Sequence, residues 1–66
     1  MLAVRTYSKT FTHNGYKINL RLFEYGDGSN KVERWVYGPD GYYRANMSYD
    51  VRNVSESECR KIRGEA

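Results

Sequence analysis

The sequence contains very few residues of the kinds that bind metals or form disulfides. Among its 66 residues there is one cysteine, Cys59, and one histidine, His13. A single cysteine excludes an internal disulfide, and the acidic residues show no metal-ligand spacing with these two residues. The sequence shows no glycine-rich phosphate loop and no paired carboxylates suited to acid–base catalysis. We therefore expect a protein that is not an enzyme and that uses no metal or cofactor.

Long apolar segments are also missing. No run approaches the roughly 20 apolar residues of a membrane-spanning helix, and the first residues do not resemble a signal peptide. These absences predict a cytoplasmic protein without a membrane partner. Residues 1–66 are expected to form one small domain, because a chain of this size buries only about 60% of the surface that its unfolded form exposes. The chain starts with Met1 and ends just after a predicted helix end, so we expect a complete small protein.

The charged and aromatic residues give the first indication of a partner. Eleven Lys and Arg residues against eight Asp and Glu residues give a net charge of +3, which favours acidic partners without forming a dense cationic patch. Aromatic residues make up 15% of the chain, and seven of them are tyrosines. Tyr, Trp and Arg are enriched in binding hot spots, but aromatic residues are also ordinary residues of β-strands. Composition alone therefore leaves both interpretations open.

The clearest local signal is the dipeptide Asn14–Gly15. Asn-Gly supplies the two positive φ angles of a type I′ turn, so it predicts a β-hairpin with strands over about 2–13 and 16–25. A two-residue loop pairs His13 with Tyr16 and fixes the register of the whole hairpin. One face then carries the expected core residues Tyr7, Phe11, Ile18, Leu20 and Leu22.

Residues 38–41, with the sequence Gly-Pro-Asp-Gly, predict a second turn. The flanking strands are expected over about 31–37 and 42–52. A loop of even length pairs Trp35 with Arg44, which suits a cation–π contact. In this register the core face of the second hairpin carries Val32, Val36, Tyr43, Ala45, Met47, Tyr49 and Val51.

The end of the chain predicts a helix over about 55–63. Ser55 is a good N-cap, Glu58 completes a capping box, and Gly64 provides a stop. A helix of this length is marginal alone, so Cys59 must pack on the sheet. The predicted fold class is α+β, a four-stranded antiparallel β-meander with one short C-terminal α-helix packed on one face. This helix is too short to cover the whole face, which leaves the chain either a monomer or a homodimer.

The opposite face of the predicted sheet gathers aromatic and arginine side chains and has no partner within the chain. Such a patch on a small protein normally marks an interaction site. Aromatic pairs can also form a small second core that stabilises the strand pairing, and the two interpretations are compatible. The candidate partner-binding residues are Arg21, Phe23, Tyr25, Trp35, Tyr37, Tyr42 and Arg44.

In size, completeness and meander-plus-helix pattern, the chain resembles the small inhibitors made by phages and mobile elements, including anti-CRISPR proteins. The resemblance implies a protein that acts by steric occupation of a protein or ribonucleoprotein surface. The alternative is a β-sheet nucleic-acid-binding module, in which exposed aromatic rings stack on bases and arginines hold phosphates. The basic-aromatic RNP1 pattern is absent, and mixed charge suits a protein interface. We therefore expect a protein or protein–nucleic-acid complex as the partner, with direct nucleic-acid binding as the second possibility.

Overall fold

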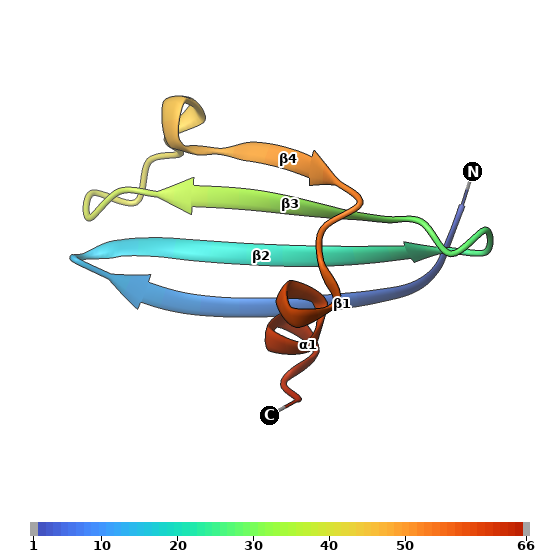
Figure 1. The fold of residues 1–66 in the computed structure, drawn as a ribbon. Coiled ribbons are helices and arrows are strands. Elements are labelled where there is room, and N and C mark those ends of the chain that lie inside the picture. The colour runs from blue at the N-terminus through green and yellow to red at the C-terminus, as the bar shows by residue number, and fades with distance from the viewer. Residues whose placement is uncertain (1, 66) are drawn as a thin grey trace.

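The computed structural model describes residues 2–65 (Figure 1). Four antiparallel strands form one open sheet in the order β1-β2-β3-β4, and one C-terminal helix, α1, packs against it. The predicted α+β meander with a terminal helix is confirmed. The elements are β1 (Ala3–His13), β2 (Tyr16–Tyr25), β3 (Asn30–Tyr37), the 3-10 helix η1 (Ala45–Met47), β4 (Tyr49–Arg52) and α1 (Glu56–Arg63).

The first hairpin has the register that its turn predicts. Asn14 and Gly15 adopt φ angles of 51° and 82°, the left-handed conformation that a type I′ turn requires. His13 pairs with Tyr16, and every pair from there to Arg5 opposite Glu24 follows in sequence. One irregularity near the start of β1 ends this regular pairing.

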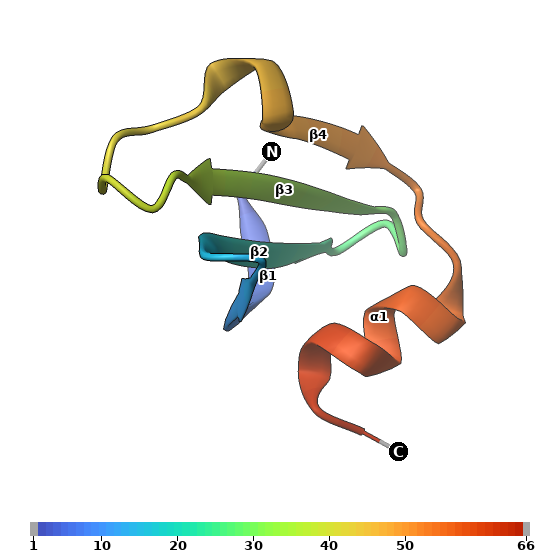
Figure 2. The same ribbon diagram turned by 90° about the vertical axis from the view of Figure 1, so that its left-hand side faces the viewer.

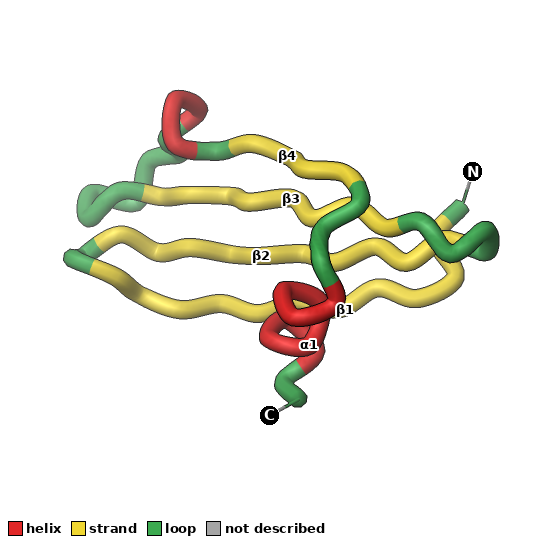
Figure 3. Tube along the Cα trace, in the orientation of Figure 1, coloured by secondary structure: helices red, strands yellow, loops and turns green. Residues whose placement is uncertain are grey.

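The second hairpin corrects the prediction of a strand over 42–52. Only Tyr49–Arg52 belongs to β4. The segment before it forms an isolated bridge at Tyr43 and then η1. Figure 3 shows η1 as a short helical turn ahead of β4. Val32 pairs with Val51, four residues later in the chain than predicted. Because the shift is even, Val51 keeps its predicted face.

Ser48 gives the physical reason for this shift. Its hydroxyl accepts a hydrogen bond from the backbone N–H of Val36 at 3.0 Å and donates one to the carbonyl of Arg44 at 2.8 Å. A side chain therefore takes the place of the backbone carbonyl that a continuous strand would offer to Val36. The chain between Arg44 and Ser48 is released from the sheet and closes into the 3-10 turn.

The helix begins and ends where its capping residues predict. The Ser55 hydroxyl accepts a hydrogen bond from the backbone N–H of Glu58 at 3.4 Å, and Gly64 takes the left-handed C-cap conformation. The Glu58 carboxylate pairs with Lys61 at 3.6 Å. The buried helix residues Cys59 and Ile62 point into the core.

The core lies between α1 and the first two strands. Leu22, Cys59 and Ile62 are buried together, and partly buried apolar side chains from the sheet and the connection before α1 surround them. Figure 2 shows α1 on one side of the sheet, and its contacts are with β1 and β2. The side chains of Tyr49 and Val51 on the same face remain exposed. The prediction that the short helix leaves part of this face uncovered is confirmed.

Asn30 joins the start of β3 to the segment that leads into α1. Its side-chain oxygen accepts a hydrogen bond from the backbone N–H of Val54 at 2.8 Å, and its amide nitrogen donates one to the Val54 carbonyl at 3.2 Å. The amide nitrogen also lies 3.5 Å from the Cys59 sulfur. The side chain of Asn30 therefore pairs with Val54 as a strand backbone would, and it fixes where the helix docks.

Candidate binding groove

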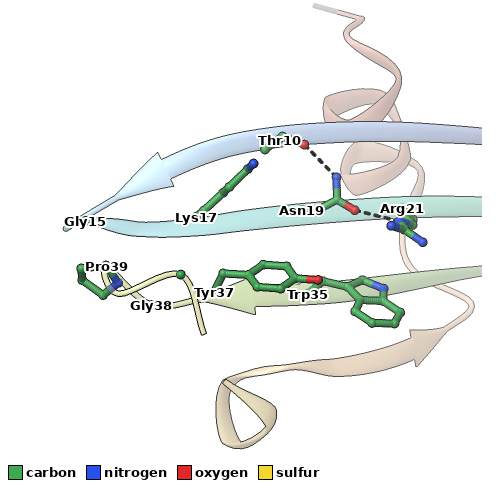
Figure 4. A pocket seen from close by; sticks show the side chains of 10 residues that line it. Thr10, Gly15, Lys17, Asn19, Arg21, Trp35, Tyr37, Gly38 and Pro39 are labelled. Carbon is green, nitrogen blue, oxygen red and sulfur yellow. Dashed lines mark hydrogen bonds between the residues drawn. The ribbon is translucent and has the colours of Figure 1, made fainter. Parts of the chain in front are cut away.

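A groove of about 560 Å³ lies on the face of the sheet opposite α1 (Figure 4). It extends over β1, β2 and β3 near their turns, and we call it the sheet groove. Its volume is within the range of ligand sites in proteins. Its lining residues are Thr10, Gly15, Lys17, Asn19, Arg21, Trp35, Tyr37, Gly38, Pro39 and Gly41.

An aromatic wall forms one side of the sheet groove. Trp35 and Tyr37 are alternate residues of β3, so their rings lie on the same face of the sheet. The ring of Tyr43 lies 5.7 Å from each of these rings, in tilted and edge-on geometry. The prediction that Tyr43 lies on the core face is wrong, because the bridge between Tyr37 and Tyr43 brings it to the groove side. The ring of Tyr43 thus packs against both Trp35 and Tyr37 and supports the wall.

Two cations from β2 form the floor beside this wall. The side chain of Arg21 lies with its guanidinium carbon 5.1 Å from the centre of the Trp35 ring. Lys17 precedes Arg21 by four residues in β2, so the two side chains lie on the same face of the sheet. Among residues 2–65, no carboxylate lines the sheet groove and neither cation forms an ion pair within 4.0 Å.

Asn19 holds the position of Arg21. Its amide nitrogen donates hydrogen bonds to Ser8 at 3.0 Å and Thr10 at 2.8 Å on β1. Its side-chain oxygen accepts from Arg21 Nε at 2.8 Å, and Figure 4 shows the contacts to Thr10 and Arg21. Arg21 is thus fixed through Nε and its flat face, while its two Nη nitrogens have no hydrogen-bond partner within residues 2–65. These nitrogens remain available to a ligand.

Phe23 and Tyr25 lie further along β2 and do not line the sheet groove. Lys31 lies 5.1 Å from the centre of the Phe23 ring and pairs with Glu33 at 3.4 Å. Glu33 also accepts a hydrogen bond from Trp35 Nε1 at 3.2 Å. Glu33 also lies directly opposite Arg21 in the β2–β3 register, so its carboxylate borders the sheet groove, and Lys31 compensates its charge.

Tyr42 and Arg44 take different positions from those predicted. Both Asp40 oxygens accept from Arg44 Nη2 at 2.9 Å, and the contact lowers the pKa of the Asp40 carboxyl. The expected cation–π pair of Arg44 with Trp35 is not formed, because the shifted register turns Arg44 toward the turn. Tyr42 is 72% exposed and lies outside the sheet groove. Whether these two residues contact a partner stays a prediction.

The sheet groove thus combines three of the seven candidate residues with others that the sequence analysis did not select. Arg21, Trp35 and Tyr37 come together. Lys17 and Asn19 share the face of Arg21 by simple alternation along β2, so strand periodicity was the signal that could have identified them.

The single cysteine and the single histidine of the chain lie in different elements, Cys59 in α1 and His13 at the end of β1. The Cys59 side chain is buried between α1 and the sheet, and this burial raises the pKa of its thiol. His13 is exposed beside the first turn. Within residues 2–65, no three His, Cys, Asp or Glu side chains gather as a metal site, and no helix is long and apolar enough to cross a membrane.

Comparison with known proteins adds no relative to this geometry. No protein-family model, curated protein or solved structure matches the chain.

Proposed function

We propose that the protein is a small non-enzymatic binding protein whose sheet groove takes a single-stranded nucleic acid. The observation that carries the proposal is the placement of Lys17 and Arg21 beside the wall of Trp35 and Tyr37, in a groove whose described lining holds no carboxylate. Proteins that bind single strands combine cations that follow the backbone with aromatic rings on which bases stack.

Each part of the sheet groove has a role in this proposal. The Nη nitrogens of Arg21 are suited to bidentate binding of a phosphate, and Lys17 adds a second positive charge further along β2. Tyr37 and Trp35 offer apolar rings to a base, and such a contact contributes about 1–3 kcal/mol per base in other proteins. Because Asn19 and Trp35 already hold Arg21, its ordering costs little on binding.

A second candidate is the steric inhibitor that occupies a protein or ribonucleoprotein surface, of the anti-CRISPR kind. Three exposed tyrosines favour it: Tyr42, Tyr43 and Tyr49 lie on or next to the connection between β3 and β4. Tyrosine is enriched in protein-binding hot spots. The two candidates differ in the response to salt, because phosphate contacts release counterions and protein contacts do not.

The test is fluorescence anisotropy with labelled twelve-nucleotide poly-dT and poly-rU strands and a duplex of the same length, measured over a salt series. We expect binding to the single strands. The slope of log affinity against log salt concentration should become less steep by about 1.4 when Lys17 and Arg21 are both replaced by serine, since each phosphate contact contributes about 0.7. The matched control replaces Arg60 and Lys61 of α1 by serine, which removes the same charges from the opposite face. Unchanged affinity in the groove variant, or equal loss in both variants, would contradict the proposal.

A further inference from the structure

The face that carries α1 has a second hollow, separate from the sheet groove. A cavity of about 190 Å³ lies between α1 and β4, and we call it the helix-side pocket. Apolar side chains from β2, β3, β4 and α1 form most of its lining, with Arg34 and Glu58 as the charged residues. At its outer rim Tyr49 and Val51 are 56% and 44% exposed. The pocket is therefore an apolar surface that the short helix leaves uncovered.

Arg34 is the unusual residue of this pocket. Its Nε is buried and has no hydrogen-bond partner within residues 2–65. None of the ion pairs in this part of the chain includes Arg34, and the Glu58 carboxylate pairs with Lys61 instead. A buried donor without a partner is destabilising, and the more so when the group is charged. Because Nε is closed to solvent, a ligand would meet the outer nitrogens of the guanidinium, and a carboxylate offers these both the opposite charge and hydrogen-bond acceptors.

The guanidinium of Arg34 extends toward the open edge of the sheet. Arg34 pairs with Tyr49 across β3 and β4, and its guanidinium carbon lies 5.5 Å from the centre of the Tyr49 ring. β4 is an edge strand, since the sheet order ends with it. An extended segment beside β4 would thus pass next to the guanidinium, and every second side chain would face the pocket.

We propose that the helix-side pocket binds an extended peptide segment of another protein, which presents a carboxylate to Arg34 and an apolar side chain to Val51. Charge complementarity selects this partner, because the pocket offers one unpaired guanidinium within an apolar lining. The site lies on the opposite face from the sheet groove, so the proposal does not depend on nucleic-acid binding.

The test uses a displayed library of random seven-residue peptides, selected against the intact protein. We expect enriched peptides to carry Asp or Glu flanked by apolar residues. The best of them, synthesised with a fluorescent label, is expected to bind at least tenfold more weakly to Arg34→Met, which keeps the apolar stem and removes the guanidinium. In an NMR titration the peptide should shift the Nε–H signal of Arg34 and the backbone signals of Tyr49 and Val51.

Two further variants locate the binding. Val51→Glu places a carboxylate at the exposed rim of the pocket and should abolish peptide binding even if Arg34→Met folds poorly. The double variant with serine at Lys17 and Arg21 should bind the peptide unchanged, which separates this site from the sheet groove. The proposal is overturned if no peptide is enriched, if the enriched peptides lack a carboxylate, if Arg34→Met and Val51→Glu bind as the unmodified protein does, or if the double variant loses binding.

Discussion

The side chain of Asn30 offers the sharpest stability experiment on this fold. Replacing Asn30 by alanine removes both hydrogen bonds to the backbone of Val54 and the contact with the Cys59 sulfur. Each hydrogen bond contributes about 1 kcal/mol, and the partly buried groups left without partners add to the loss. We expect the free energy of unfolding to fall by about 2–3 kcal/mol, a large fraction of the roughly 3–10 kcal/mol available to a domain of this size.

The assay is urea unfolding, followed by the fluorescence of Trp35, the one tryptophan in the chain. Thermal unfolding should show a midpoint lower by roughly 10–20 °C. Asn30→Asp keeps the acceptor for the Val54 N–H but loses the donor, so its loss should be intermediate. Asn46→Ala is the matched control, because Asn46 is exposed in η1. If Asn30→Ala costs no more than Asn46→Ala, the docking of α1 does not depend on this side chain and the reasoning is wrong.

Three further outcomes are expected. Asn19→Ala should weaken single-strand binding by roughly two- to tenfold, because Arg21 loses its orientation, while the urea midpoint changes little; equal affinity in anisotropy would remove Asn19 as a positioning residue. Gly38→Ala should displace Arg44, since a Cβ at position 38 would collide with the guanidinium of Arg44. The pKa of the Asp40 carboxyl, which Arg44 lowers, should then rise toward the ordinary 3.8 in an NMR titration. Burial raises the pKa of Cys59, so the folded protein holds the thiol proton more tightly than the unfolded chain does. The contribution of this thiol to stability is complete below pH 9.0 and is lost as the pH rises further. Urea unfolding at pH 8 and pH 10 should therefore show a larger loss of stability for the unmodified protein than for Cys59→Ala.

The first hairpin and the helix could be predicted closely because local chemistry decides them. Asn14–Gly15 allows one turn geometry, and that turn sets every pair of β1 and β2. Ser55 and Gly64 bound the helix by hydrogen bonding and backbone conformation that each residue type prefers. In both places neighbouring residues determine the structure, so the sequence pattern was sufficient.

The segment 42–48 could not be predicted because a contact between distant residues decides it. The hydroxyl of Ser48 satisfies the N–H of Val36, twelve positions earlier, and nothing in the alternation of the segment indicates this. An uninterrupted strand was the simpler prediction from the tyrosines and the turn at 38–41.

The accuracy of the site prediction followed that of the strand pairing. Three of the candidate residues meet in the sheet groove: Arg21, Trp35 and Tyr37. Their positions depend on the pairing of β2 with β1 and β3 and not on the shifted pairing of the second hairpin. Tyr42 and Arg44 were placed through the second hairpin, and its shifted register moved both of them.

The position of α1 gives the two faces of the sheet different properties. Its residues Cys59 and Ile62 pack on Leu22, which lies in β2 directly after Arg21. The strand that carries the cations of the sheet groove is therefore anchored from behind by the best-packed part of the core, which favours a preorganised binding surface. The same placement leaves β4 outside the main contacts of α1, and within residues 2–65 the Nε of Arg34 has no acceptor. The docking of one short helix thus supports the sheet groove from the opposite face. On its own face it leaves an apolar pocket that contains Arg34, so both binding proposals follow from the position of α1.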